Sequence, residues 1–466
     1  MPLVSLNPQD PVPLIDQIVT AIRSRVEERA LRAGTRLPSV RRFAVEHGVS
    51  RFTVVQAYDR LVAMGYLNSR PGSGFYVAAR RTPQAAKRDE CHLDRAMDVL
   101  WLLRNALREQ AKDPMPGAGW LPGSWLDETG IQRSLRNLSH RGGDFLTGYG
   151  LPAGYGPLRS LLQHRLGEIG VAADESQIVL TRGVSHAADL VMRYLVRAGD
   201  AVLVDDPGYF ILFGSLKSLG ARLVGVPWNL DGPDVAALES LIREHRPKVF
   251  FTNTVLHNPT GASISQPVAY RILQLAEKYD LTIVEDDIYG DFHPAPVTRL
   301  ASLDQLDRVV YLSSFSKTVS AGLRVGYIAC KRDLAESLTD LKLLTGLTTS
   351  VIDERLVYQL LTEGHYRKHL DKLRGRLHGA RDKMVRGLER VGLDVYLEPE
   401  GGMFVWAKLG GERSDAAEVA SHAARQGITL APGNLFRPHQ EPSPWLRFNA
   451  ASCDDPALFE FLAGLA

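Results

Sequence analysis

The sequence Ser313-Ser314-Phe315-Ser316-Lys317-Thr318, followed by Gly322-Leu323-Arg324-Val325-Gly326, best predicts the larger fold of this chain. It places one lysine among small residues directly after the apolar run at 309–312, which has the composition of a buried strand. A lysine held among small or apolar neighbours can condense with an aldehyde. The hydroxyls of Ser314 and Ser316 and the guanidinium of Arg324 are suited to hold a phosphate, the arginine by a bidentate grip.

An aldehyde and a phosphate on one small molecule describe pyridoxal 5'-phosphate (PLP), so the stretch predicts PLP as a cofactor bound through Lys317. A surface lysine at the end of a strand is the alternative, and for an isolated Ser-Lys pair it is the commoner case. The choice between them depends on whether the remaining parts of a PLP site occur elsewhere in the chain.

The composition is typical of a soluble globular protein with several domains. The chain has 466 residues, of which 45% are hydrophobic and 23% charged. No apolar run is long enough to span a bilayer, and residues 1–20 lack the basic residues of a signal peptide. Cys91, Cys330 and Cys453 are few and unclustered, which indicates a reducing compartment and no metal site. We therefore expect a cytoplasmic protein that does not contact a membrane.

Positive charge is concentrated near the N-terminus. Of the chain's 55 basic and 53 acidic residues, 12 arginines and six acids lie within residues 1–81, which leaves 43 basic and 47 acidic residues in the remainder. Apolar spacing predicts helices at 13–31, ended by Gly34, at 40–47 and at 51–64, the last two capped by Ser39 and Ser50. Short extended runs at 65–67 and 74–77 flank a hairpin tip at 70–73. Residues 1–80 are thus predicted to form a winged helix-turn-helix.

The remaining chain is predicted to be a linker followed by an α/β domain. Residues 81–114 are assigned to the linker, with a helical pattern at 92–110, and 114–123 is rich in glycine and proline. Apolar runs at 177–181, 201–204, 249–252, 281–284 and 309–312 then alternate with helical segments. This alternation predicts a mostly parallel sheet covered on both faces, within a domain spanning 115–466. The turn at 181–185 precedes a helix predicted at 187–195, and its backbone amides are suited to a phosphate.

Motifs in the N-terminal part resemble the GntR-type winged helix. They are Leu37-Pro38-Ser39-Val40-Arg41-Arg42, Gly48-Val49-Ser50-Arg51-Phe52-Thr53-Val54 and Tyr58-Asp59-Arg60-Leu61. The resemblance implies that the helix at 51–64 enters the major groove of a double-stranded DNA operator by its N-terminal end. The residues predicted to contact DNA are Ser39, Arg41, Ser50, Arg51, Thr53 and Gly72. The alternative is a solvated basic surface on a protein-binding winged helix.

The C-terminal part resembles the fold-type-I aminotransferases, with a smaller α+β subdomain at the C-terminus. This resemblance implies that Asp286 faces the pyridine nitrogen of PLP, that Asn258 and Tyr289 bond its phenolic oxygen, and that Tyr209 stacks on its ring. Arg447 would grip a substrate carboxylate, and Tyr149 would reach the phosphate of a neighbouring subunit in a homodimer. Phosphate contacts are assigned to Gly183, Val184, Ser185, Ser314, Ser316 and Arg324. Tyr209 could equally be part of the core, and an acidic strand end such as 285–287 is common in any α/β protein.

A GntR-like winged helix ahead of an aminotransferase-like domain is the layout of the MocR family of transcriptional regulators. That resemblance implies a PLP-dependent regulator that senses an amino acid or amine by aldimine exchange at Lys317. Two other functions stay open. One is a metabolic aminotransferase with an ancillary DNA-binding domain, for which Lys317, Asp286, Tyr289 and Arg447 are all present. The other is an interaction scaffold in which both sites are vestigial.

Overall fold

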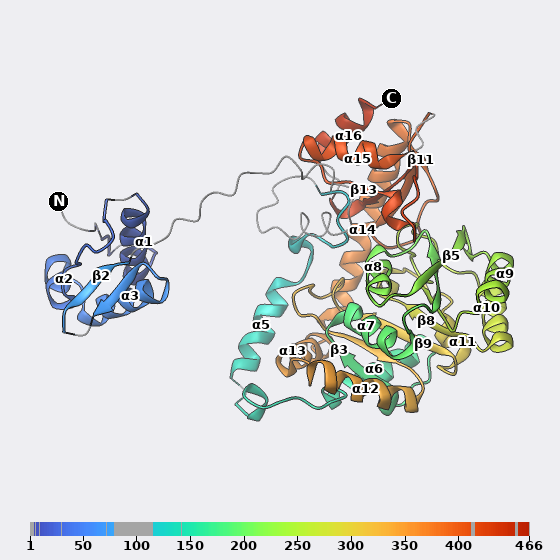
Figure 1. The fold of residues 1–466 in the computed structure, drawn as a ribbon, viewed down its shortest axis with the longest axis horizontal. Coiled ribbons are helices and arrows are strands. Elements are labelled where there is room, and N and C mark those ends of the chain that lie inside the picture. Colours follow the sequence, from blue (N-terminus) through green and yellow to red (C-terminus); the bar gives the residue numbers. More distant parts are fainter. Residues whose placement is uncertain are drawn as a thin grey trace. The chain divides into compact units, whose positions relative to one another are not determined.

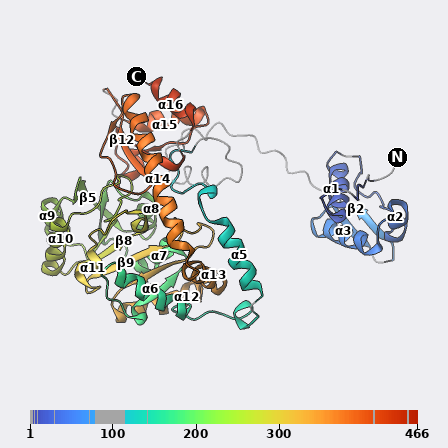
Figure 2. The same ribbon diagram turned by 180° about the vertical axis from the view of Figure 1, so that it is seen from behind.

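The computed structural model describes residues 4, 6–8, 10–28, 30–70, 72–78, 115–140, 142–411, 415–452 and 455–465. These residues form two compact units, one before residue 79 and one after residue 114 (Figures 1 and 2). The predicted linker at 81–114, the helix predicted within it, Cys91 and Cys453 all lie outside the described residues.

The N-terminal unit is a winged helix-turn-helix, as predicted. Its elements are α1 (Leu14–Glu27), α2 (Val40–His47), α3 (Arg51–Ala63), β1 (Leu67–Arg70) and β2 (Gly74–Val77). The side chains of Ser39 and Ser50 accept hydrogen bonds from the backbone N–H groups of Arg42 and Thr53, so both serines cap their helices. The core of the unit is built around Ile18, Ile22, Phe43, Tyr58 and Leu61, all fully buried.

Two boundaries differ from the prediction. Helix α1 ends at Glu27 rather than at residue 31, and Gly34 lies in a later turn with φ of +83°. The N–H of Gly34 donates to the carbonyl of Val77, so this glycine helps to join the turn to the wing. Strand β1 continues to Arg70, which pairs with Gly74 and leaves a hairpin tip shorter than the predicted 70–73.

The larger unit contains an eight-stranded mixed sheet in the order β3-β10-β9-β8-β7-β4-β5-β6. Strands β9, β8, β7, β4 and β5 are parallel, whereas β10 runs antiparallel to both β3 and β9. The strands are β3 (Ile178–Thr181), β4 (Ala201–Asp206), β5 (Arg222–Asn229), β6 (Gly232–Pro233), β7 (Val249–Thr252), β8 (Thr282–Asp286), β9 (Val309–Ser314) and β10 (Gly326–Ala329).

Helices cover both faces of this sheet (Figure 1), which confirms the predicted α/β layering. Val309 and Tyr311 of β9 pack on one face and Val310 and Leu312 on the other, so the strand is apolar throughout. One face is covered by α6 (Gly156–Glu168), α9 (Val235–His245), α10 (Gln266–Tyr279), α11 (Leu300–Asp304) and α13 (Val351–Thr362). The other is covered by α7 (Gly183–Leu195), α8 (Phe210–Ser218) and α12 (Arg332–Gly346).

A smaller α+β subdomain follows the long helix α14 (His365–Arg390). Its antiparallel sheet has the order β11-β12-β14-β13. The elements are β11 (Asp394–Val395), β12 (Phe404–Lys408), α15 (Ala416–Arg425), β13 (Ala431–Pro432), β14 (Trp445–Asn449) and α16 (Pro456–Ala463), and α5 (Glu128–Ser139) precedes the large sheet. Short 3₁₀ turns span Gly123–Trp125, Asp144–Leu146, Glu175–Gln177, Gly290–Phe292, Gly433–Phe436 and Ala450–Ser452. Within the described ranges, no helix has both the length and the apolar character needed to cross a membrane.

A buried ion pair lies directly behind the carboxyl end of β8. Asp287 accepts hydrogen bonds from the guanidinium of Arg299 and the hydroxyl of Tyr311, each at 2.6 Å, and all three side chains are buried. Separating a buried cation from its partner costs free energy, so the contact between Arg299 and Asp287 is strongly maintained. It therefore holds in place the backbone that carries the neighbouring Asp286.

We expect Asp287→Asn to lower the free energy of unfolding by about 3–5 kcal/mol, because it leaves Arg299 buried without a carboxylate. The matched control is Asp280→Asn, which removes the partner of Arg308 in an ion pair whose carboxylate is exposed and should cost less than about 1 kcal/mol. Denaturant unfolding of both variants checks this, and equal effects would contradict it.

Candidate functional site

One cavity opens at the carboxyl edge of the parallel strands, where open α/β sheets bind ligands. Its walls come from the ends of β8 and β9, the N-terminus of α7, strand β14 and a segment at 117–120. Ten of the residues singled out from the sequence line it: Val184, Ser185, Tyr209, Asn258, Asp286, Tyr289, Ser316, Lys317, Arg324 and Arg447. They come from six separate stretches of the chain, which the fold brings to one place.

Lys317 is partly buried and reaches into this cavity. Its Nζ donates to the carbonyl oxygen of Gly119 at 2.6 Å. Burial and, to a smaller extent, the nearby positive charges of Arg447 and Arg324 together lower the pKa of Lys317 to about 8, a shift that Asp286 partly opposes. A larger share of this amine is therefore neutral near pH 7 than for an ordinary lysine. The neutral form is the one that attacks an aldehyde carbon.

A second buried lysine shows that the shifted pKa alone does not select Lys317. Burial also lowers the pKa of Lys342 to about 8. However, its Nζ donates to the carbonyl of Leu180 at 2.7 Å and to the hydroxyl of Thr349 at 3.2 Å, and Glu354 lies close enough to raise its pKa. Lys342 does not line the cavity. Its amine is committed to structural contacts, whereas Lys317 faces a space that a ligand can enter.

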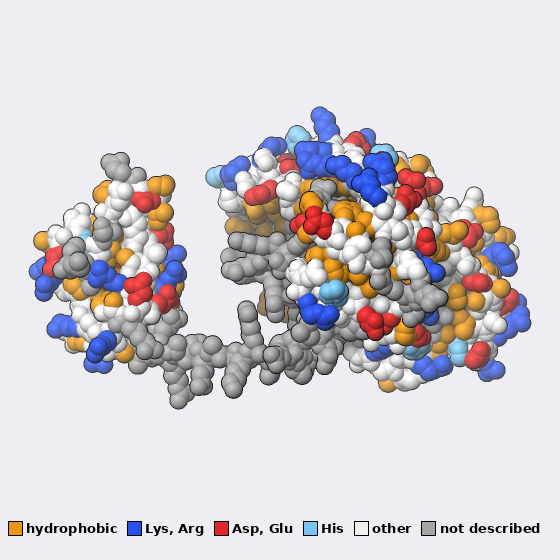
Figure 3. Space-filling view, turned by 90° about the horizontal axis from the view of Figure 1, so that it is seen from above, with side chains coloured by type: hydrophobic (Ala, Val, Ile, Leu, Met, Phe, Trp, Pro, Cys, Tyr) orange, Lys and Arg blue, Asp and Glu red, His pale blue; other side chains and the backbone are white. Residues whose placement is uncertain are grey.

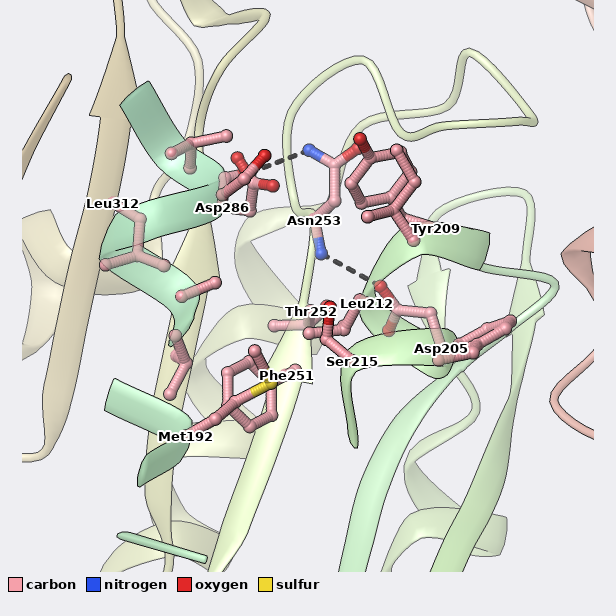
Figure 4. A pocket seen from close by; sticks show the side chains of 16 residues that line it. Met192, Asp205, Tyr209, Leu212, Ser215, Phe251, Thr252, Asn253, Asp286 and Leu312 are labelled. Carbon is pink, nitrogen blue, oxygen red and sulfur yellow. Dashed lines mark hydrogen bonds between the residues drawn. The ribbon is translucent and has the colours of Figure 1, made fainter. Parts of the chain in front are cut away.

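Asp286 faces the same cavity at the end of β8. Burial and, to a smaller extent, the adjacent Asp287 together raise the pKa of Asp286 to about 7, a shift that the backbone N–H of Ile288 and the charge of Lys317 partly oppose. The amide of Asn253 donates to the backbone carbonyl of Asp286 at 2.8 Å, and the N–H of Asn253 donates to Asp205, as Figure 4 shows. A carboxylate buried here favours a positive charge on any ring nitrogen placed against it.

Arg324 forms an anion-binding corner with the N-terminus of α7. Its Nη1 donates to the hydroxyl of Ser316 at 3.1 Å and its Nη2 to the carbonyl of Arg182 at 3.2 Å. Gly183 has φ of +74°, a backbone conformation that favours glycine, and a Cβ there would lie 2.7 Å from Nη2 of Arg324 and displace it. A guanidinium, a hydroxyl and the first amides of a 13-residue helix therefore converge, which fits a phosphate group.

Arg447 of β14 is a buried cation without a carboxylate partner in the described part of the chain. Only 2% of the residue is exposed, and its guanidinium lies over the ring of Phe404 at 4.2 Å. It donates to Oδ1 of Asn258 at 2.8 Å and to the carbonyl of Gly117 at 2.7 Å. Burial lowers the pKa of Arg447 to about 10, with Tyr289 and Tyr209 acting in the opposite direction. Such a group is suited to a carboxylate supplied by a ligand.

The segment at 117–120, which we call the strap, was missed by the sequence reasoning. Besides the two carbonyls that bond Lys317 and Arg447, the carbonyls of Ala118 and Trp120 accept from the amide of Asn449 at 3.0 and 2.7 Å. A Cβ at Gly117 would lie 2.5 Å from the backbone of Leu430, so glycine is needed there. The sequence predicted only irregular chain here, because backbone carbonyls carry no side-chain signal.

Other cavity residues were also missed. Asn253, Phe210, Ile211 and Ile288 line the site. Asn253 gave a usable signal, since a polar residue directly after a buried strand of a parallel sheet points to the ligand edge. The apolar residues gave none, because they could equally belong to the core.

Three residues assigned to the cofactor do not line the cavity within one chain. Gly183 and Ser314 lie behind it, the first under Arg324 and the second with its hydroxyl accepting from the N–H of Ser316. Tyr149 is 84% exposed. Its assignment to the site of a neighbouring subunit stays a prediction.

The helix-turn-helix presents a second candidate site. Arg41 and Arg51 are exposed, and neither forms an ion pair with a described residue. Ser50 and Thr53 share a hydrogen bond of 2.8 Å between their hydroxyls, so they organise the start of α3. Phe52, whose side chain is 69% exposed at this helix start, was not predicted as a contact. An exposed aromatic residue at the N-terminus of α3 is suited to apolar contact with bases.

Comparisons with known proteins agree with this geometry. Residues 131–465 match the model for aminotransferase class I and II, and residues 14–77 match that for bacterial regulatory proteins of the gntR family. The chain belongs to the aminotransferase class I and II family. With the gntR-type domain ahead of the aminotransferase domain, it has the MocR layout predicted from the sequence.

Two relatives match nearly the whole of this chain, and an aminotransferase of known structure matches most of it. The probable rhizopine catabolism regulatory protein MocR of Rhizobium meliloti is 29% identical, over 97% of this chain and 93% of that protein. The uncharacterized HTH-type transcriptional regulator YdfD of Bacillus subtilis is 28% identical, over 94% and 93%. The Pyrococcus horikoshii kynurenine aminotransferase, solved with PMP, matches with a TM-score of 0.73 and 27% identity, over 79% of this chain and 93% of its own.

The environment of Lys317 predicts two opposite pH shifts. In cofactor-free protein, the rate of imine formation with added PLP should rise with pH around a midpoint near 8, since only the neutral amine reacts. Arg447→Gln removes a positive neighbour and should raise that midpoint, whereas Asp286→Asn removes a negative one and should lower it. Stopped-flow absorbance across pH 6–10 measures both, and shifts in the same direction would contradict the assignment.

Proposed function

We propose that this chain is a cytoplasmic DNA-binding transcriptional regulator whose larger unit binds PLP on Lys317 and senses an amino acid or an amine. The observation that supports this most is that two cationic side chains, Lys317 and Arg447, face one cavity and form hydrogen bonds there, within the described part of the chain, with uncharged groups. An amino acid carries an amine for the first position and a carboxylate for the second.

The residues of the cavity fit the cofactor. The corner of Arg324, Ser316 and the α7 amides would take the phosphate, and Asp286 would face the ring nitrogen. Tyr209 would lie against the ring, and Asn258 and Tyr289 would reach its phenolic oxygen. Bound PLP supplies an aldehyde carbon that forms an imine with an amine, which allows the amine of the effector to replace that of Lys317.

The strap provides a route from the cavity to the rest of the chain. A ligand carboxylate on Arg447 competes with the carbonyl of Gly117, whereas an effector amine that replaces Lys317 on PLP frees the lysine to donate to Gly119 again. An amino-acid effector would therefore loosen one anchor of the strap and restore the other, in a segment that continues toward residues 81–114, the proposed linker. A ligand with different affinities for two strap arrangements shifts their populations, which is the requirement for coupling.

The operator would be bound by the winged helix, residues 1–80, with Ser39, Arg41, Ser50, Arg51, Thr53 and Gly72 at the interface. The domain at 115–466 would form a homodimer in which Tyr149 contacts the phosphate held by the partner. The exposure of Tyr149 in the single chain supports this part of the proposal, because a side chain of that size gains from being covered.

A metabolic aminotransferase is the second candidate. Lys317, Asp286, Tyr289 and Arg447 surround one cavity, as transamination requires. A spectral titration of PLP-loaded protein with candidate amino acids, followed by a keto-acid assay, separates the two functions. A spectral change with altered DNA affinity and no turnover supports the regulator, whereas turnover on the order of 1–1000 per second supports the enzyme.

We expect Lys317→Ala to abolish the visible absorption band of the PLP–lysine imine and the response of DNA affinity to effector, because among the described residues no other lysine lines the cavity. Borohydride reduction followed by peptide mapping should place the adduct on Lys317 in the unchanged protein. Lys342→Ala is the matched control, since Lys342 has a similarly lowered pKa outside the cavity, and it should keep both the absorbance and the adduct. An adduct on Lys342 would contradict the proposal.

Arg51→Ala is expected to weaken operator binding about 10- to 100-fold, the effect of losing one bidentate base contact. Arg60→Ala is its control on the same helix, because Arg60 is held by Asp16 at 2.6 Å. Fluorescence anisotropy with operator DNA measures both, and the PLP absorbance of each variant should be unchanged. Equal losses for both variants would point to unfolding of the domain.

A further inference from the structure

A stripe of basic side chains runs along α14 of the larger unit. Its residues, called the basic stripe here, are Lys368, Lys372, Arg376, Lys383, Arg386 and Arg390, and all six are exposed. Their spacings of four, four, seven, three and four residues place them on one face of an α-helix. Gly375 and Gly379 lie near this face and add no side chain to it. Figure 3 shows a marked concentration of Lys and Arg side chains on the surface of this unit.

The charges of the basic stripe are not neutralised by neighbouring groups. None of the six forms an ion pair with another described residue. Helix α14 also carries three acidic residues, Asp371, Asp382 and Glu389. By helical geometry they are rotated about the helix axis by about 80–100° from the centre line of the basic stripe. Asp371 pairs with Arg374 and Asp382 with His378 instead. On the neighbouring helix α16, Glu460 alone among acids lines the groove beside the last three stripe residues.

The concentration of charge is local and does not follow from the composition. Residues 82–466 hold 43 basic and 47 acidic residues, so this part of the chain is slightly acidic. An ordinary solvated helix face mixes both signs, which supports it through pairs three and four residues apart. Lys368 has Asp371 three residues away, and Arg386 has one acid four residues before it and another three residues after it. The other four cations have no acid at either spacing within α14. This face therefore carries a surplus of positive charges that repel one another. Such an arrangement is stabilised by an extended polyanion.

The length of the basic stripe matches one turn of duplex DNA. From Lys368 to Arg390 the helix rises about 33 Å at 1.5 Å per residue, and one turn of B-DNA spans about 34–36 Å. We propose that the basic stripe binds the phosphate backbone of double-stranded DNA, without sequence preference, as a contact separate from the winged helix. This inference rests on the proposed DNA-binding function, because the same chain is then held close to a polyanion of the right charge and length.

The test compares two full-length triple variants with the same change in charge. Lys383→Glu/Arg386→Glu/Arg390→Glu reverses half of the basic stripe. Lys217→Glu/Lys248→Glu/Arg271→Glu is the control, since these residues are also exposed, form no ion pair with a described residue and belong to other elements of the unit. Far-UV circular dichroism and PLP absorbance verify that both variants are folded.

Binding is measured with random-sequence duplexes of about 16 and 60 base pairs over a series of salt concentrations. Each lost phosphate contact reduces the slope of log K against log salt by about 0.9. We expect the stripe variant to show a slope smaller by about 2–3 than the control on the longer duplex. At low salt it should bind the longer duplex about 10- to 100-fold more weakly than the control does.

Equal slopes for the two triple variants would overturn the inference while leaving the proposed function intact, provided that Arg51→Ala still weakens operator binding. Failure of the unchanged protein to bind any DNA would instead overturn the proposed function. A change in mass by light scattering for the stripe variant alone would make the stripe a subunit contact. Tighter stripe-dependent binding to a duplex RNA of equal length would assign it to RNA, and either result rejects DNA as the occupant.

Discussion

The structure of the larger unit depends on holding three ionisable groups, one fully and two partly buried, around one cavity without pairing them with each other. Lys317, Asp286 and Arg447 all have pKa values moved toward their neutral forms by burial. Each would be more stable in water or against a fixed partner. The fold holds them apart because each comes from a different element: Asp286 from β8, Lys317 from the loop after β9, and Arg447 from β14 of the small subdomain. Ionisable side chains that are shielded from water and lack a charged partner in the protein are available to bind a ligand.

The surrounding structure is arranged to maintain that state. Asp287, the residue after Asp286, forms a tight buried ion pair with Arg299. The carboxylate of Asp287 therefore stabilises the fold, whereas that of Asp286 stays available to a ligand. The pKa of Lys342 is lowered by burial as that of Lys317 is, but the amine of Lys342 donates hydrogen bonds to a backbone carbonyl and to a side-chain hydroxyl. Within each pair, Asp287 and Lys342 are the more buried members and also have the stronger partners from the chain. In both cases the residue that faces the cavity is the one left without a strong partner from the chain.

The strap is the segment through which, in the proposed regulator, ligand binding in the cavity would affect the rest of the chain. The carbonyls of the strap accept hydrogen bonds from the cationic groups of Lys317 and Arg447, and these bonds are weaker than an ion pair with a carboxylate or a covalent bond to an aldehyde would be. The cofactor and a ligand carboxylate would therefore replace contacts to the strap with stronger ones. The winged helix and the basic stripe would bind a different ligand, DNA. The winged helix would read the base sequence, and the basic stripe would attract the phosphate backbone. The proposed regulator thus has its chemical and electrostatic functions on separate surfaces.

The sequence by itself determined the two folds and predicted many of the residues that line the cavity, because these are written in local patterns. The caps at Ser39 and Ser50, four of the five parallel strands and the residues around Lys317 were readable from spacing and residue type, whereas the parallel strand β5 and the antiparallel strand β10 were not predicted. The sequence analysis placed the end of α1 too late, because the apolar spacing continues past Glu27 although the helical backbone ends there. Only the tertiary structure brought the strap onto Lys317 and Arg447 and separated Lys317 from Lys342. Backbone carbonyls look alike in every sequence, and a lysine acquires its partners only when distant segments pack around it.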